Sequence, residues 1–187
     1  MLKMNRIIKQ ISSFVFFVFF LYQSNAQDTL RAKIPVDADT KLVAYKDAIN
    51  ETGTKDELYI RSLEWINANY KNAAEVTRRR DAVNGEIEGQ HRIQLFYKDK
   101  DGVIIKTGLV EYTFKLQFKD NKYRYFFTNF YLKDKSRYPI ENWMDKTKPG
   151  YSPLWDEYLN IIDIHICKLI ESLKTTMQAR KIKKDEW

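Results

Sequence analysis

Apolar and polar residues alternate strictly along residues 110–118, and this alternation ends at the Asp120-Asn121 pair. A period of two predicts a β-strand with one buried face. Beyond the pair, residues 123–132 carry apolar side chains at both odd-numbered and even-numbered positions, so both faces of this strand are apolar. The sequence therefore predicts a hairpin in which one apolar face enters a core, and it leaves open what covers the apolar residues of the other face.

Two other segments predict helices. Thr54 and Glu57 form a capping box ahead of apolar residues at helical spacing, which predicts a helix from there to about residue 70. An apolar stripe that repeats every three to four residues from Trp155 to Met177 predicts a second helix, with Ser152 as its N-cap.

Strand patterns occupy most of the remaining chain, at residues 41–49, 73–82, 86–97, 103–118 and 123–132. Asn84-Gly85 predicts a tight hairpin turn between the second and third of these strands. The order β-α-β-β-β-β-α predicts an α+β fold, in which an antiparallel β-sheet carries two helices on one face, because two amphipathic stripes must be buried. The opposite face of the sheet is then open.

A tight turn at Asp120-Asn121 fixes the register of the last hairpin. Phe118 then faces Tyr123 and Phe114 faces Phe127, and we assign the face that these pairs share to the core under the helices. The same register places three apolar residues on the open face: Phe126, Phe130 and Leu132.

An exposed apolar patch of this kind usually marks an interaction site. The segment 133–152 is long for a connection and carries further aromatic residues. Three alternatives follow: this segment covers the patch as a second small core, two copies form a homodimer through the sheet face, or a ligand or an exported protein partner binds there. The predicted ligand or partner surface comprises Phe126, Phe130, Leu132, Tyr138 and Trp143.

Residues 1–26 have the three parts of a secretory signal peptide. Lys3, Arg6 and Lys9 form a basic region, an apolar run follows over residues 14–22, and the small residue Ala26 stands at the cleavage position. The apolar run is shorter than the roughly 20 residues that a membrane-spanning helix needs. We expect cleavage after Ala26, with an uncleaved anchor as the alternative.

Export would deliver the protein to the periplasm or the extracellular space, without a membrane span after signal cleavage. No cysteine follows the apolar run, so we do not expect a lipoprotein. The rest of the chain divides into an N-terminal tether (27–39), a single domain (40–180) and a basic C-terminal tail (181–187).

Charge argues against a nucleic-acid partner. Loss of the three cations of the signal lowers the formal net charge from +7 to +4, and the basic tail holds much of the remainder. Nucleic-acid binders concentrate cations on one face, whereas the central domain is close to balanced. The internal basic run Arg78–Arg80 is either a solvated strand edge or an anion site.

Few residues have the chemistry for catalysis. The single cysteine, Cys167, cannot form an intrachain disulfide and is expected to be a buried small apolar residue. The two histidines, His91 and His165, lie in different elements and have no partner at metal-ligand spacing, so we expect no metal and no other cofactor.

A non-catalytic exported binding module is therefore the leading functional hypothesis, with no catalytic residue assigned. The alternative is a cell-envelope hydrolase that acts on a glycan with acids of the 133–152 segment. Glu141 and Asp145 flank Trp143 there, and a carboxylate pair beside an aromatic ring suits sugar chemistry.

Three stretches carry a family resemblance: "TKDELYIRSLEWINANY" on the first predicted helix, "RDAVNGEIEG" after it, and "KDNKYRYFFTNF" at the last hairpin. Together with the order of the elements, they resemble a family of secreted bacterial proteins, a domain of unknown function described as having a TATA-binding-protein-like fold. The resemblance covers residues 40–135 and, by topology, the last helix. It implies a curved sheet with the first strand beside the last. DNA recognition does not follow, because the TATA-binding protein uses two such halves and this chain has one.

Overall fold

The computed structural model describes residues 34–134 and 136–178. The predicted signal peptide, most of the predicted tether and the basic tail lie outside the described residues. In chain order the described part contains β1 (Tyr45–Asn50), α2 (Lys55–Asn69), α3 (Ala73–Val76), β2 (Thr77–Asp81), β3 (Glu86–Lys98), β4 (Ile104–Lys119), β5 (Lys122–Lys133), β6 (Arg137–Pro139), the 3-10 helix η1 (Ile140–Met144) and α4 (Leu154–Met177). Within this part, no helix has the length and apolar character needed to cross a membrane.

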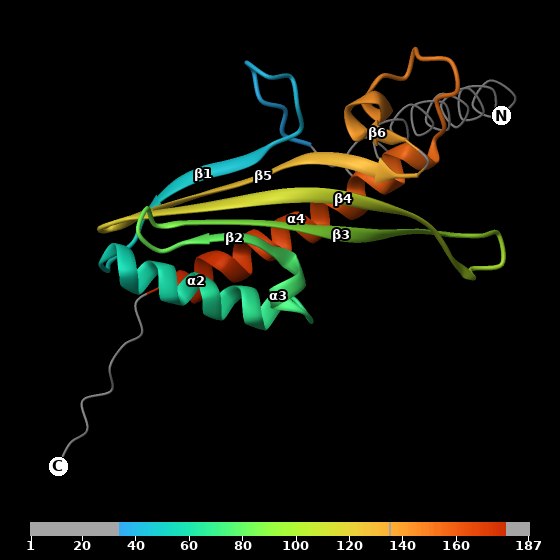
Figure 1. The fold of residues 1–187 in the computed structure, drawn as a ribbon. Helices are drawn as coiled ribbons and strands as arrows, with labels where there is room; N and C mark the ends of the chain where they lie inside the picture. Colours follow the sequence, from blue (N-terminus) through green and yellow to red (C-terminus); the bar gives the residue numbers. More distant parts are fainter. Residues whose placement is uncertain (1–33, 135, 179–187) are drawn as a thin grey trace, which may run out of the picture. The chain divides into compact units, whose positions relative to one another are not determined.

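The strands form one six-stranded antiparallel sheet in the order β1-β5-β4-β3-β2, and β6 pairs with the end of β5. β1 lies beside β5, which confirms the arrangement that the family resemblance implied. The β3–β4 hairpin extends beyond the other strands (Figure 1). The prediction of an α+β fold is confirmed.

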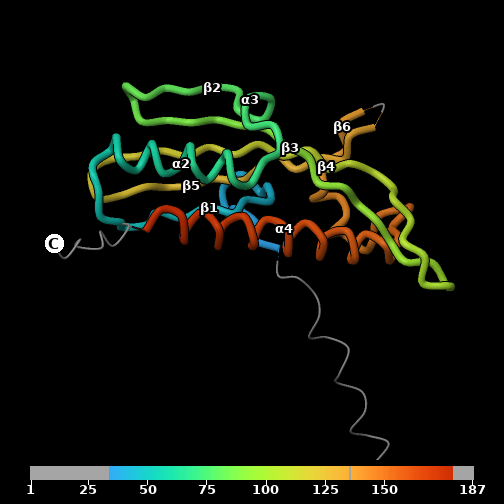
Figure 2. Tube along the Cα trace, turned by 90° about the horizontal axis from the view of Figure 1, so that it is seen from below, coloured from blue at the N-terminus to red at the C-terminus, as the bar shows by residue number. Residues whose placement is uncertain are grey.

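Helices α2 and α4 lie against the same face of the sheet, as Figures 1 and 2 show from two directions. The predicted capping box opens α2: the hydroxyl of Thr54 accepts a hydrogen bond from the N–H of Glu57 (3.2 Å), and the Glu57 carboxylate accepts one from the N–H of Thr54 (2.8 Å). The apolar stripe of α4 is buried from Leu159 to Met177. The prediction that both helices share one face is confirmed.

An aromatic cluster between α2 and the sheet forms the centre of the core. Trp65 is fully buried, and its ring meets Tyr70, Phe114 and Phe127 edge-on at centroid separations of 5.6, 6.0 and 6.4 Å. Each such pair stabilises the fold by about 0.5–1.5 kcal/mol beyond the burial of its surface. Gly89 leaves room for this cluster, because a Cβ at that position would lie 2.2 Å from the Phe114 ring.

A β-bulge in the β4–β5 hairpin overturns part of the predicted register. The pairs Phe118 with Tyr123 and Phe114 with Phe127 occur as predicted, but the register shifts between Glu111 and Thr113. Asn129, with a φ of 56°, lies at this shift. Asparagine tolerates the left-handed conformation better than other residues that carry a Cβ. Beyond it, each side chain of β5 points to the face opposite to the one predicted.

The bulge moves Phe130 into the core. Phe130 is only 1% exposed; its ring stacks on Tyr112 at 5.7 Å and meets Tyr45 edge-on at 5.9 Å. Leu132 lies opposite Val110 on the helix side, instead of on the open face. The predicted placement of Phe130 and Leu132 on the open face is therefore wrong.

Three local predictions also differ from the structure. Residues 73–76 form α3, whose N-cap side chain, Asn72, accepts a hydrogen bond from the N–H of Glu75, so this stretch does not begin an edge strand. The β2–β3 connection spans residues 82–85, which is longer than a two-residue turn. Helix α4 has Pro153 as its N-cap residue, while Ser152 Oγ accepts a hydrogen bond from the N–H of Leu154 (3.3 Å).

Candidate functional site

The face of the sheet opposite the helices is polar and charged. Of the three apolar residues predicted there, only Phe126 remains, half-buried and opposite Lys115 on β4. Exposed apolar side chains gather instead near the tip of the β3–β4 hairpin, at Phe96, Val103 and Ile104. The open face is therefore not the contiguous apolar patch that the sequence predicted.

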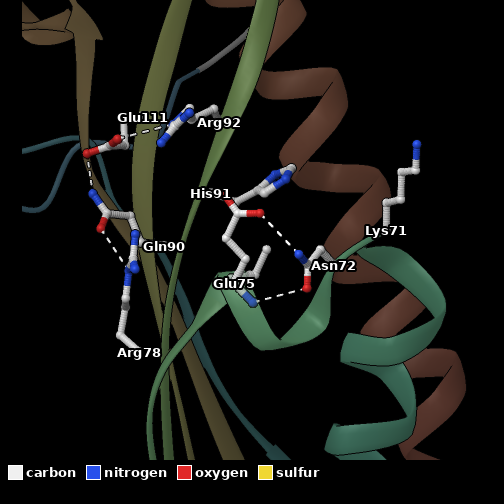
Figure 3. A pocket seen from close by; sticks show the side chains of 9 residues that line it. Lys71, Asn72, Glu75, Arg78, Gln90, His91, Arg92 and Glu111 are labelled. Carbon is white, nitrogen blue, oxygen red and sulfur yellow. Dashed lines mark hydrogen bonds and ion pairs between the residues drawn. The ribbon is translucent and has the colours of Figure 1, made fainter.

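Two rows of hydrogen-bonded side chains cross this face. In each row a glutamine is bonded to a carboxylate on one side and to an arginine on the other, and we call these rows relays. The first consists of Glu111, Gln90 and Arg78, on β4, β3 and β2. The Gln90 amide nitrogen donates to the Glu111 carboxylate, and its oxygen accepts from Arg78 Nε at 3.2 Å (Figure 3). The carboxylate thereby turns the amide so that its oxygen faces the guanidinium group.

Glu111 anchors the first relay and is only 7% exposed. Burial alone would raise the pKa of its carboxyl group, but the hydrogen bond from the Tyr131 hydroxyl and the nearby charges of Lys133 and Arg92 hold the pKa below its ordinary value. Arg92 Nε lies 3.5 Å from the carboxylate. Glu111 is therefore a charged, fully bonded group that fixes the position of Gln90.

The second relay consists of Glu86, Gln117 and Arg124, on β3, β4 and β5. The Gln117 amide nitrogen donates to Glu86, and its oxygen accepts from Arg124 Nε at 2.5 Å. The guanidinium carbon of Arg124 lies 5.3 Å from the centroid of the Phe126 ring, in a cation–π contact. Hydrogen bonds from Lys115 and Gln117 hold the pKa of Glu86 below its ordinary value.

A cavity of about 550 Å³, which we call the relay cavity, lies over this part of the sheet. Both arginines and both glutamines of the relays line it, together with Phe126 and the polar residues Thr113, Thr128 and Asn129. Its volume falls in the range of roughly 300–1,000 Å³ that is typical of ligand sites. Its lining residues come from the paired strands β2 to β5.

Two neighbouring cavities share residues with the relay cavity. One, of about 510 Å³, lies where β3 continues past β2, and Lys71, Glu75 and Arg92 line it together with the first relay (Figure 3). The other, of about 520 Å³, is bounded by Arg137 and Glu141. The 133–152 segment therefore walls one end of the open face, but none of its residues lines the relay cavity.

Tyr138 and Trp143 do not join Phe126. Trp143 is 1% exposed and stacks on Trp155 of α4 at a centroid separation of 6.2 Å. Tyr138, on β6, lies 6.4 Å from the ring of Trp155. The structure thus places both residues beside α4, and the prediction that they belong to one surface with Phe126 is wrong.

The two acids considered for glycan hydrolysis have separate structural partners. The Glu141 carboxylate accepts a hydrogen bond from the N–H of Val43 at 2.7 Å. The Asp145 carboxylate accepts from both the hydroxyl and the N–H of Thr147, and these bonds lower the pKa of Asp145. A general acid needs a raised pKa, so the geometry does not favour this pair as a catalytic one.

The two histidines approach one another in the core. Each ring meets Tyr112 edge-on, with centroid separations of 6.3 Å for His91 and 6.5 Å for His165. Tyr112 in turn hydrogen-bonds the hydroxyl of Tyr70 at 3.2 Å. Burial lowers the pKa of both histidines. In residues 34–134 and 136–178, His91 Nδ1 and His165 Nε2 are buried without a hydrogen-bond partner.

Cys167 is exposed, so the expectation of a buried thiol is wrong. It lies on the face of α4 away from the stripe, and its thiol donates to Asp163 over 3.8 Å. No three His, Cys, Asp or Glu side chains of the described residues are arranged to hold a metal ion.

In the sequence, the two glutamines and Arg124 do not stand out as site residues, and Arg78 is undecided between a solvated edge and an anion site. The sequence does contain a signal: Gln90 and Gln117 lie within predicted strands, at positions that alternate with the apolar residues and so face away from the core. The β2–β3 pairing brings Gln90 next to Arg78 and the β4–β5 pairing brings Gln117 opposite Arg124, whereas the pairing of β3 with β4 brings each glutamine to its carboxylate.

Two solved structures and one family model are similar to this chain. The structure of a TBP-like protein from Parabacteroides distasonis is similar with a TM-score of 0.64 at 16% identity, over 79% of this chain and 99% of that chain. The structure of a DUF4468 family protein from Bacteroides ovatus is similar with a TM-score of 0.63 at 12% identity, over 82% of this chain and 96% of that chain. No curated protein matches the sequence. Residues 45–133 match the model of the family described as "Domain of unknown function (DUF4468) with TBP-like fold", and this part of the chain is a domain of that family.

Proposed function

We propose that this protein is an exported, non-catalytic binding module that receives a protein partner on the open face of its sheet. The observation that carries this proposal is the relay cavity, a concave site of about 550 Å³ whose polar groups are held by hydrogen bonds before any ligand arrives. Fixed polar groups reduce the entropy lost on binding. The hydrogen bonds of the two relays lie on the face opposite the helices, so they do not serve to bury the core.

Export to the periplasm or the extracellular space is part of the proposal and derives from the basic and apolar regions of residues 1–26. A partner would therefore be another exported protein or a second copy of the chain. Binding is favoured over glycan hydrolysis because Glu141 and Asp145 each hold a neighbouring backbone N–H group, and the pKa of Asp145 is lowered.

Site-specific photo-crosslinking tests the proposal. A photoreactive phenylalanine analogue replaces Phe126 in the full-length protein, expressed in its natural host, and a matched variant carries it at Ile60. Ile60 is an apolar residue of α2 that is 57% exposed, so it reports on a surface away from the open face. We expect a protein adduct from position 126 and none from position 60.

A Phe126→Ser variant provides a second measurement. It should capture less of the crosslinked partner when the partner is supplied in trans, while its thermal unfolding stays close to that of the wild type. Adducts of equal yield at positions 60 and 126, or at position 60 alone, would show that the open face is not the binding surface.

A further inference from the structure

The cations of the relay cavity differ in how they are neutralised. Lys115 lies between two carboxylates, 3.0 Å from Glu86 and 3.1 Å from Glu88. Arg78 and Arg124 have no ion pair with any carboxylate of the described residues. The lining holds three cations, these two arginines and Lys115, against the single anion Glu88.

Each of the two arginines is held by a neutral group. Only the Nε of each guanidinium is bonded, to the amide oxygen of Gln90 or Gln117. An arginine has five N–H donors in a planar fork, so the terminal N–H groups of both are left for a ligand. A carboxylate in place of either glutamine would neutralise the arginine, whereas the amide orients the group and leaves its charge intact.

Charge and shape together define the ligand chemistry. A guanidinium group binds a carboxylate through two parallel hydrogen bonds, which are stronger than those between neutral groups. The cavity is also lined by Thr113, Thr128 and Asn129 and by the ring of Phe126. These groups complement the N–H and C=O groups and the aliphatic parts of a polypeptide.

Spacing gives a further constraint. Arg78 on β2 and Arg124 on β5 are separated by three strand intervals and by an offset of two to three residues along the strands, or about 16 Å between backbones. An extended chain rises about 3.3 Å per residue, so roughly five residues span this distance. Two acidic side chains on one extended segment can therefore engage both arginines.

We infer that the relay cavity recognises an acidic polypeptide segment, with Arg78 and Arg124 each binding one carboxylate. This inference rests on the proposed function, since it names the chemistry of the partner that the open face would receive. The two relays then have one role: they orient the arginines without neutralising them.

Isothermal titration calorimetry of residues 27–187 with a hexaglutamate peptide tests the inference. Hexaglutamine serves as the uncharged control peptide. Hexaglutamate should bind and hexaglutamine should not. The double variant Arg78→Gln/Arg124→Gln should bind hexaglutamate on the order of 100-fold more weakly, about 10-fold for each arginine–carboxylate pair that the substitutions remove.

Two further variants separate recognition from overall charge. Arg80→Gln/Lys119→Gln removes two charges from exposed residues of β2 and β4 that do not line the cavity, and it should weaken binding less than about 3-fold because exposed charges at a distance are screened by salt. Arg78→Lys/Arg124→Lys keeps the charge but loses the planar fork, and it should bind more weakly than the wild type.

Failure to bind hexaglutamate, or equal losses of affinity in the cavity variant and its matched control, would overturn the inference. Binding of a uronic-acid trisaccharide with the same arginine dependence, without binding of hexaglutamate, would also overturn it. If crosslinking at position 126 still yields a protein adduct in that case, the proposed function stands and only the chemistry of the partner is wrong. Loss of both results would remove the open face as a binding surface.

Discussion

Separate replacement of Phe130 and Phe126 by alanine tests which of the two phenylalanines belongs to the core. Phe130 is 1% exposed and lies against Tyr112 and Tyr45. Truncation of a fully buried phenylalanine removes its transfer free energy and leaves a cavity, which together cost about 3–5 kcal/mol. We therefore expect Phe130→Ala to lower the free energy of unfolding by about 3–5 kcal/mol.

Phe126→Ala should cost less than about 1.5 kcal/mol. Its ring is half-buried, and the cation–π contact with Arg124 contributes about 0.5–1 kcal/mol at an exposed site. Urea unfolding, followed by circular dichroism and tryptophan fluorescence, measures both variants on the same scale. Equal destabilisation of the two variants, or a larger effect of Phe126→Ala, would refute the bulge at Asn129 and restore the unbroken register.

Three further predictions concern the core and its pH dependence. Gly89→Ala would bring a Cβ to 2.2 Å from the Phe114 ring, and the forced movement should cost about 1–3 kcal/mol in urea unfolding; an unchanged midpoint would show that the ring has room to move. Asn129→Val should destabilise by at least about 1–2 kcal/mol, because a β-branched residue is strained at a φ of 56°, whereas Asn129→Gly should remain near wild type; equal stability of the two variants would contradict the bulge. Burial lowers the pKa of His91 and His165 in the folded state, so the unfolded chain binds more protons and stability should fall as the pH drops through about 6.5, by up to about 1.4 kcal/mol per pH unit for each histidine; an identical pH dependence in the His91→Gln/His165→Gln variant would show that other groups cause the loss.

The alternation of apolar and polar residues predicted the hairpin register near the turn, and it failed beyond Asn129. Pairing from Phe118 with Tyr123 to Thr113 with Thr128 follows from the pattern and the turn. A bulge adds one residue to one strand and exchanges the two faces after it. The only local signal was an asparagine inside an aromatic strand, a residue that strands disfavour and that adopts positive φ readily.

For the helices, a local capping signal predicted the structure only where no other pattern obscured it. The capping box of Thr54 and Glu57 is contained in four residues, so it could be found from the sequence alone. The short helix α3 has an equally local cause, the Asn72 side chain that accepts from the N–H of Glu75, but the strand pattern that follows it obscured this signal.

The first relay was out of reach because its contacts depend on the registers of two strand pairs, whereas the Gln117–Arg124 contact of the second relay follows from the predicted hairpin register. Arg78 and Gln90 are 12 residues apart, and Gln90 and Glu111 are 21 apart. Their meeting depends on the register of β2 with β3 and of β3 with β4, including the shift between Thr77 and Arg79. No periodic pattern within one strand encodes those registers.

Nuclear magnetic resonance of the arginine Nε–H groups, recorded on a ¹⁵N-labelled chain without residues 1–26, tests most directly whether the open face binds an acidic partner through its relays. Upon addition of hexaglutamate, we expect the signals of Arg78 and Arg124 to shift with saturation while the signal of Arg80 stays in place. Unchanged signals for the two relay arginines, or a uniform shift of every arginine, would contradict the account.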